Sequence, residues 1–84
     1  MRKQLYSVRD LKAESFGFPI PADNVGLVLR QWCDAVNSPD LPIINHPEDY
    51  ALYRIGEFDT EKGVLIAEDQ PIHVASAEEV LRHA

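Results

Sequence analysis

Two apolar runs separated by a short polar loop constrain the fold of this chain more than any other feature. The first run is YALYRIGEF, residues 50–58, and the second is VLIAED, residues 64–69. The loop between them, DTEKG, ends in Gly63, and glycine readily takes the positive φ that hairpin turns require. The spacing therefore predicts two adjacent antiparallel strands. Both faces of the first run are largely apolar, so we expect a central strand or one that a partner covers.

The amino-terminal third predicts one further strand and a loop. Residues 3–10 alternate in the manner of a strand, but neither face is fully apolar, so we expect an edge strand or one that pairs across a dimer. Residues 13–22 contain two prolines and a glycine and are predicted to be a loop. Phe16, Phe18 and Ile20 in this loop either cover the core or form a patch that stacks on bases or binds a partner.

Residues 24–36, NVGLVLRQWCDAV, predict an amphipathic helix, because apolar residues recur at the spacing of one helix face. The predicted buried stripe consists of Val25, Val28, Leu29, Trp32, Cys33 and Val36. Asp23 is the predicted N-cap of this helix. Ser76 and Glu79 have the spacing of a capping box, which predicts a short C-terminal helix.

These elements predict a single α+β domain over residues 1–84. We expect a small antiparallel sheet in the chain order strand–helix–strand–strand, a short C-terminal helix, and one amphipathic helix packed on the sheet. A chain this short buries only about 60–65% of its unfolded surface, so small domains often gain stability from disulfides, metals or self-association. Cys33 is the only cysteine, which excludes an internal disulfide. We therefore expect a homodimer.

The charge of the chain is unevenly distributed. Residues 1–36 hold five basic and four acidic side chains, a net +1, whereas residues 37–84 hold three basic and ten acidic side chains, a net −7. Strong non-specific DNA binding requires many neutralised phosphates, so the chain as a whole is poorly suited to it. Any nucleic-acid contact is expected near the N-terminal strand. The candidate residues are Arg2, Lys3, Arg9, Lys12, Arg30, Phe16 and Phe18.

The segment His46-Pro47-Glu48-Asp49 has the residue types of a metal site or an acid–base site. A metal site needs three or four converging ligands, and no residue elsewhere has a matching spacing. No serine lies in a nucleophile-elbow context, and no glycine-rich phosphate loop is present. We expect the segment to set the start of the following strand, with Pro47 holding His46 extended and the two carboxylates accepting backbone hydrogen bonds. We expect no catalytic activity, no metal and no cofactor.

The start of the chain, MRKQLYSVRD, has no apolar run after its charges, so it is predicted to be neither a signal peptide nor an anchor. No stretch reaches the length that spans a bilayer. We expect a cytoplasmic protein that makes no membrane contact.

Four blocks, LYSVRDLKAE, GLVLRQWCDAVN, HPEDYALYRIGEFD and KGVLIAEDQP, resemble in sequence and order the small nonstructural protein of gokushoviruses. Gokushoviruses are a branch of the microviruses, phages with single-stranded circular DNA. The resemblance covers residues 4–71 and implies a role in the cytoplasm of the infected bacterium, as the presumed counterpart of microvirus protein C. Protein C helps switch replication to single-strand synthesis coupled with packaging. The family is often described as DNA-binding, but the resemblance implies no particular site residues.

Two functional hypotheses follow. The first is an accessory factor in viral DNA replication and packaging that contacts single-stranded DNA through the basic N-terminal strand, while the acidic half faces a replication or assembly protein. The second is an acidic adaptor that binds a viral or host protein and no nucleic acid.

Overall fold

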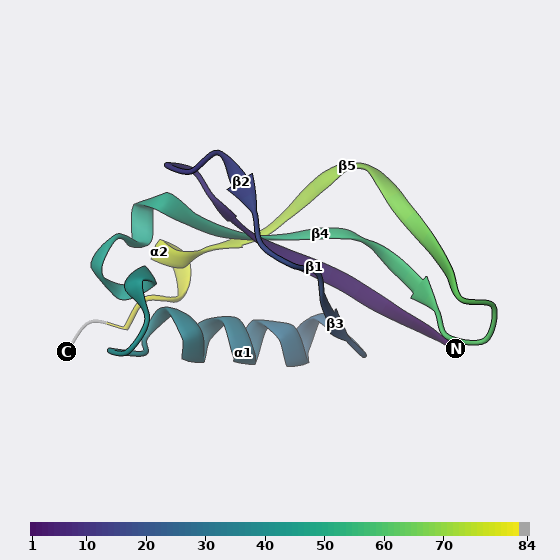
Figure 1. The fold of residues 1–84 in the computed structure, drawn as a ribbon. Helices are drawn as coiled ribbons and strands as arrows, with labels where there is room; N and C mark the ends of the chain where they lie inside the picture. Colours follow the sequence, from purple (N-terminus) through teal and green to yellow (C-terminus); the bar gives the residue numbers. More distant parts are fainter. Residues whose placement is uncertain (83–84) are drawn as a thin grey trace.

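The computed structural model describes residues 1–82, which form one curled antiparallel sheet with a helix along one face (Figure 1). The strands are β1 (Arg2–Asp10), β2 (Ser15–Phe16), β3 (Ile20–Ala22), β4 (Tyr50–Asp59) and β5 (Val64–Ser76). The helices are α1 (Val25–Val36) and α2 (Ala77–Val80), and two 3₁₀ turns, Pro42–Asn45 and Pro47–Asp49, precede β4. The predicted α+β class is confirmed. Among residues 1–82, neither helix is long and apolar enough to cross a membrane.

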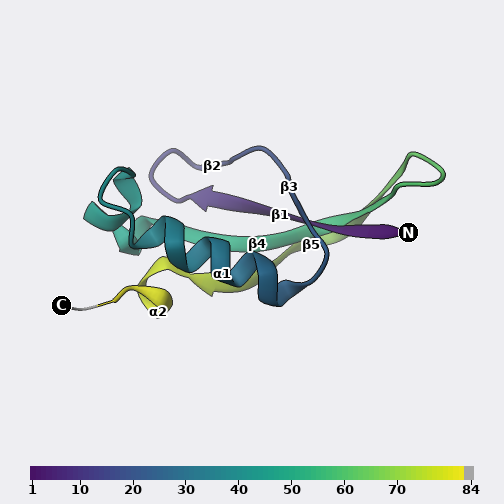
Figure 2. The same ribbon diagram turned by 90° about the horizontal axis from the view of Figure 1, so that it is seen from below.

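The sheet is built around β1 and β4. Its order is β2-β1-β4-β5, and β3 also pairs with β1, next to β2. Strand β4 is therefore central, and its hairpin partner is β5, as the two apolar runs predicted. Helix α1 lies along the sheet on one side (Figure 2). We call the opposite side the open face.

The prediction of an edge or dimer-paired strand at residues 3–10 was wrong, since β1 is flanked on both sides within the chain. The segment predicted as a loop, residues 13–22, turns back and contributes β2 and β3 to the outer side of β1. Pro21 lies within β3, opposite Leu5. Proline has no N–H to donate, but it is tolerated at a sheet edge, where no further strand requires that donor.

Strand β5 is longer than predicted, because it continues past Asp69 to Ser76. It too contains a proline, Pro71, and it too lies at an edge of the sheet. Pairing with β4 is interrupted by a bulge: Gly56 pairs with Ala67 and Arg54 with Ile72, so four residues of β5 arch away from the ladder (Figure 1). This bulge divides β5 into two paired segments, and a smaller shift of register between Leu52 and Tyr53 interrupts the second.

Helix α1 begins one residue later than the capping prediction implied. Asn24, not Asp23, is the N-cap, and its side chain accepts a hydrogen bond from the Leu27 amide at 3.0 Å. The carboxylate of Asp23 is instead paired with Lys3 on β1. Val28, Trp32 and Val36 are buried as predicted, whereas Val25, which the same stripe included, is 46% exposed.

The core lies between α1 and the sheet. Strands β1, β4 and β5 contribute Tyr6, Leu52 and Ala75, which join the buried side of α1. Helix α2 closes the far end of this layer with Ala77, and the predicted Ser76–Glu79 capping box is confirmed. Asn37, after the end of α1, donates to the carbonyl of Val80 at 3.0 Å. This bond ties the two helices together.

The β4–β5 turn follows the prediction. Gly63 has a φ of 68°, and its amide donates to the Asp59 carbonyl at 2.8 Å. The Asp59 side chain accepts from the amides of Glu61 and Lys62 at 2.9 and 3.1 Å. These backbone hydrogen bonds hold the pKa of the Asp59 carboxyl below its ordinary value of 3.8.

The lowered pKa of Asp59 makes the stability of the turn depend on pH. A carboxyl with a depressed folded-state pKa stabilises the fold above its unfolded pKa, and this contribution is lost as the pH falls through the folded-state value. The Asp59→Asn variant is therefore expected to be less stable than wild type at pH 7, with the difference shrinking below about pH 4. Urea unfolding of both proteins at several pH values measures this difference in stability. A difference that stays constant down to pH 3 contradicts the prediction.

Candidate nucleic-acid interface

Three rings form a row across the open face. Phe16 on β2 meets Tyr53 on β4 with ring centroids 5.5 Å apart, and Tyr53 meets His73 on β5 at the same distance. Both contacts are edge-to-face, with interplanar angles of 74° and 88°. Leu52 packs in the core beneath α1, so its neighbour Tyr53 points to the opposite side of the sheet. We call Phe16, Tyr53 and His73 the aromatic row.

A cation lies beside one end of the aromatic row. The guanidinium carbon of Arg9, which pairs with Phe16 across β1 and β2, lies 5.6 Å from the centroid of the Phe16 ring. The Arg9 Nε is buried and has no hydrogen-bond partner among residues 1–82. A cation over a ring face is attracted by the ring quadrupole, which helps fix the position of Phe16.

Hydrogen bonds to β1 hold the loop that carries Phe16. The buried Ser7 hydroxyl donates to the Gly17 carbonyl at 2.7 Å, and the Gly17 amide donates to the Val8 carbonyl at 2.9 Å. The next residue, Phe18, is 93% exposed. Lys12, in the turn between β1 and β2, is also exposed. Of the two alternatives for this loop, covering the core is wrong for Phe18 and for Phe16, which is 41% exposed, whereas Ile20 is partly buried and borders the core layer.

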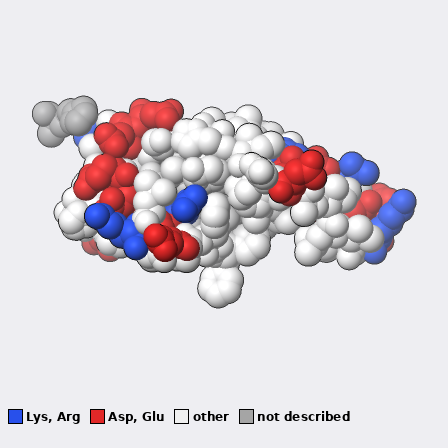
Figure 3. Space-filling view, turned by 90° about the horizontal axis from the view of Figure 1, so that it is seen from above, with Lys and Arg blue, Asp and Glu red and all other residues white. Residues whose placement is uncertain are grey.

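The other predicted contact residues lie elsewhere. Arg2 pairs with Glu57 at 3.3 Å, and Lys3 pairs with Asp23. Arg30 is exposed on α1, across the sheet from the aromatic row. On the open face, Lys and Arg form small separate groups beside acidic ones, and the middle of this face carries neither (Figure 3). The structure therefore brings Arg9 and Phe16 together, keeps Lys12 and Phe18 on the loops that flank β2, and separates these residues from the other three cations.

Arg54 is held in an internal ion-pair cluster. Its side chain bonds Glu68 at 3.1 Å and Glu57 at 2.8 Å, and all three side chains are mostly buried. The hydrogen bond to Glu68, followed by that to Glu57, raises the pKa of the guanidinium. Glu68 begins the bulge in β5, so this cluster fixes the bulge.

The segment His46–Asp49 mainly determines how β4 begins. Pro47 starts a 3₁₀ turn, the Asp49 amide donates to the His46 carbonyl at 3.0 Å, and Tyr50 is the first residue of β4. These bonds use backbone groups, so the predicted role of the two carboxylates as acceptors is not seen among residues 1–82. Possible ligand atoms of His46, Glu48 and Asp49 lie within 4.8 Å of one another, so three residues of the segment itself converge. Both His46 and Glu48 are exposed.

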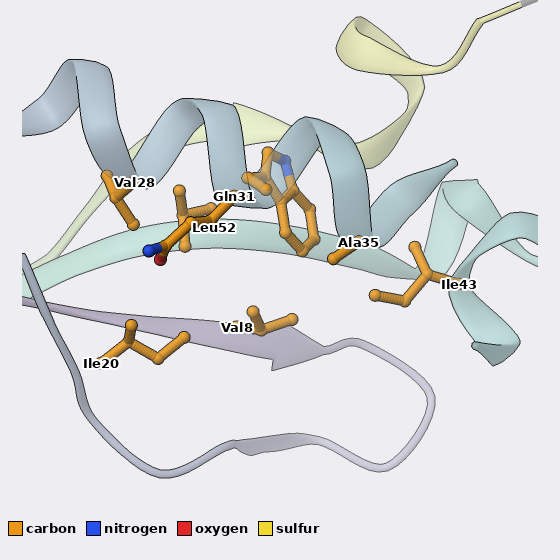
Figure 4. A pocket seen from close by; sticks show the side chains of 8 residues that line it. Val8, Ile20, Val28, Gln31, Ala35, Ile43 and Leu52 are labelled. Carbon is orange, nitrogen blue, oxygen red and sulfur yellow. The ribbon is translucent and has the colours of Figure 1, made fainter. Parts of the chain in front are cut away.

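A hollow of 180 Å³ lies between α1 and the sheet (Figure 4). Val28, Ala35 and Gln31 border it from α1, and the strands and the first 3₁₀ turn complete the lining with Val8, Ile20, Leu52 and Ile43. Trp32 also contributes. The lining is apolar except for the Gln31 amide, so the hollow offers no acid, base or nucleophile. It is a gap in the core layer, separate from the aromatic row.

The family described as phage ORF5 protein matches residues 3–80, nearly the whole chain. The chain belongs to this family. The aromatic row and the cations beside it are thus parts of a phage protein, and all of them lie within the matched residues. No curated protein and no solved structure matches this phage protein.

Sequence reasoning missed Tyr53 and His73 as candidate site residues. Tyr53 was placed on the correct strand, but its neighbours across the sheet depend on register. His73 lay beyond the predicted end of β5. The available signal for Tyr53 was that it shares a strand face with Ala51 and Ile55, because this puts an aromatic ring on the face away from Leu52.

Proposed function

We propose that this phage protein is a nonstructural accessory factor in viral DNA replication and packaging, the gokushovirus counterpart of microvirus protein C. In this proposal it works in the cytoplasm of the infected bacterium, without catalytic activity, and contacts single-stranded DNA. Its membership of the phage ORF5 family supports a role in phage biology. The DNA contact is supported by the structure of the open face.

The aromatic row with Arg9 is the observation that carries the DNA contact. Rings on an open sheet face, next to a cation, suit single strands because every base offers a π-face and every nucleotide a phosphate. Phe18 adds a ring that is 93% exposed, and Lys12 adds a charge on the same loop. Few cations are involved, so the binding is weak and depends on stacking more than on charge.

Fluorescence anisotropy with labelled oligothymidylate tests this contact. Because stacking contributes about 1–3 kcal/mol per base, Phe18→Ala is expected to raise the Kd about tenfold. Val25→Ala is the matched control, since Val25 is an exposed apolar residue on α1, away from the open face. Anisotropy that stays flat at low salt up to high micromolar protein removes the DNA contact from the proposal.

The salt dependence separates a local site from general attraction to cations. Each phosphate contact contributes a slope of about −0.7 to log Kobs against log salt for single strands. Lys12→Gln is therefore expected to flatten the slope by about this amount, whereas Arg30→Gln on the other side of the molecule leaves it unchanged. Equal effects of the two substitutions contradict a site on the open face.

A protein-binding adaptor is the second candidate function. It is favoured by the pairing of Arg2 and Lys3 with Glu57 and Asp23, which leaves the negative charge of the chain dominant. Affinity capture from infected, nuclease-treated cells tests it. Recovery of one protein by both the wild type and the Phe18→Ala variant, with no measurable DNA binding by either, supports the adaptor over the DNA contact.

A further inference from the structure

The end of the sheet beyond the bulge forms an arm, which we define as residues 1–5 and 55–67. In Figure 1 it extends beyond the end of α1, toward the N-terminus and the β4–β5 turn. Most of the arm therefore has no helix on either face, and only its inner end approaches α1, where Lys3 lies beside Leu27 and Gln31. It nevertheless carries a run of exposed apolar residues at the start of β5, where Val64, Leu65 and Ile66 are 48%, 70% and 41% exposed.

A groove of 270 Å³ follows the arm. Leu5, Ile55, Phe58, Leu65 and Ile66 contribute to its lining, and Pro19 borders it from the loop before β3. The lining is almost entirely apolar. Leu65 borders this groove and is itself 70% exposed, so the arm carries a hollow and an exposed apolar side chain next to each other. An interface related by a twofold axis joins the same patch of both copies, so it requires that an exposed side chain of each copy can enter the hollow of the other.

The shape of the molecule indicates that one chain leaves surface uncovered. A compact monomer of 9.5 kDa exposes about 5,050 Å², whereas this chain exposes 5668 Å². The radius of gyration is 13.3 Å, against about 12 Å for a compact domain of this length. The excess surface of about 600 Å² therefore reflects an elongated chain, 44 Å in its longest extent, with the arm at one end.

The charge of the arm favours a second copy of the same chain as its partner. Within the arm, Arg2, Lys3 and Lys62 balance Glu57, Asp59 and Glu61, so its side-chain charges sum to zero. The whole formal charge of −6 therefore belongs to the remaining residues. Two copies joined at their arms bring neutral surfaces together and keep the acidic remainders of the two chains apart. Self-association through the acidic remainder of the chain brings like charges closer.

We propose that the protein is a homodimer in which the arms of two copies pack against each other, with Leu65 of each copy in the groove of the other. The bulge and Pro71 limit pairing along the β5 edge to the short stretch of residues 64–67, and the groove spans β1, β4 and β5, so the contact is made by the face of the arm. The aromatic row lies outside the arm, on the other side of the bulge, and remains uncovered. This inference does not depend on the DNA contact proposed above.

Sedimentation equilibrium over a range of concentrations tests the dimer. Wild type is expected to show twice the 9.5 kDa of one chain at micromolar concentration. Leu65→Glu is expected to raise the dimer Kd at least about 30-fold, as for a residue central to an interface, with an unchanged far-UV spectrum. Ile72→Glu is the matched control, since Ile72 is 49% exposed on the same strand but lies beyond the bulge, and it should keep the wild-type mass.

Three results overturn the inference. The first is a wild type that stays at the mass of one chain up to high micromolar concentration. The second is a Leu65→Glu variant that remains a dimer, and the third is an Ile72→Glu variant that dissociates as readily. If Leu65→Glu does not fold, Leu65→Gln takes its place with the same expected loss of the dimer.

Discussion

The Trp32→Ala variant is expected to lose about 3–5 kcal/mol of its free energy of unfolding. Trp32 is 3% exposed and is the largest side chain that α1 contributes to the core. Its removal forfeits the burial of the indole and leaves a cavity between α1 and β4, next to the existing hollow. A domain of this length has roughly 4–13 kcal/mol of stability in total, so the variant is expected to be partly unfolded at 37 °C.

Two controls accompany this substitution, with urea unfolding followed by far-UV circular dichroism as the measurement. Trp32→Phe is expected to cost less, because it keeps an aromatic ring and removes an indole N–H that has no partner among residues 1–82. Val25→Ala, on the exposed side of the same helix, is expected to change stability by less than about 0.5 kcal/mol. A Val25→Ala cost equal to that of Trp32→Ala contradicts the orientation of α1 described above.

Gly56→Ala is expected to destabilise the protein by about 2–3 kcal/mol, because it overpacks a site that cannot expand. A Cβ at this position would lie 2.4 Å from the Ile66 carbonyl oxygen and 3.1 Å from the Ala67 Cα. Both atoms belong to the backbone of β5, so no side-chain rotation relieves the clash. The substitution forces β4 and β5 apart beside the bulge.

The matched control is Gly17→Ala. A Cβ there would meet only the Val8 carbonyl oxygen, at an ordinary 3.7 Å, so the expected change is within about 0.5 kcal/mol. The same urea titrations measure both variants. If the Gly56→Ala and Gly17→Ala variants are equally stable, then β4 and β5 do not approach each other at Gly56 as closely as described above.

Local patterns in the sequence predicted the elements at the centre of the fold. Helix α1 and the β4–β5 hairpin follow from apolar periodicity and turn chemistry, which depend on residues close together in the chain. The segments wrongly predicted to lie outside strands were at the two edges, and both contain proline. Pro21 and Pro71 suggested breaks in the sheet, yet an edge strand does not need every N–H, so both residues lie inside strands.

The candidate site was harder to predict from the sequence, because it depends on the register of four strands. Arg9, Phe16, Tyr53 and His73 are far apart in the chain and meet only after β1, β4 and β5 are aligned. The same limitation hid the partners of Arg2 and Lys3. The charge count correctly located the cations in the sequence but could not show that acidic residues from β4 and the loop before α1 neutralise two of them.

The prolines at the two edges have a consequence for how copies of this chain can assemble. Endless filaments of the cross-β kind grow by adding strands to open edges, and each added strand needs an uninterrupted set of backbone donors. Pro21 on one side and Pro71 with its arch on the other remove that template. Growth of the sheet by strand-by-strand addition of further copies is therefore disfavoured at both edges.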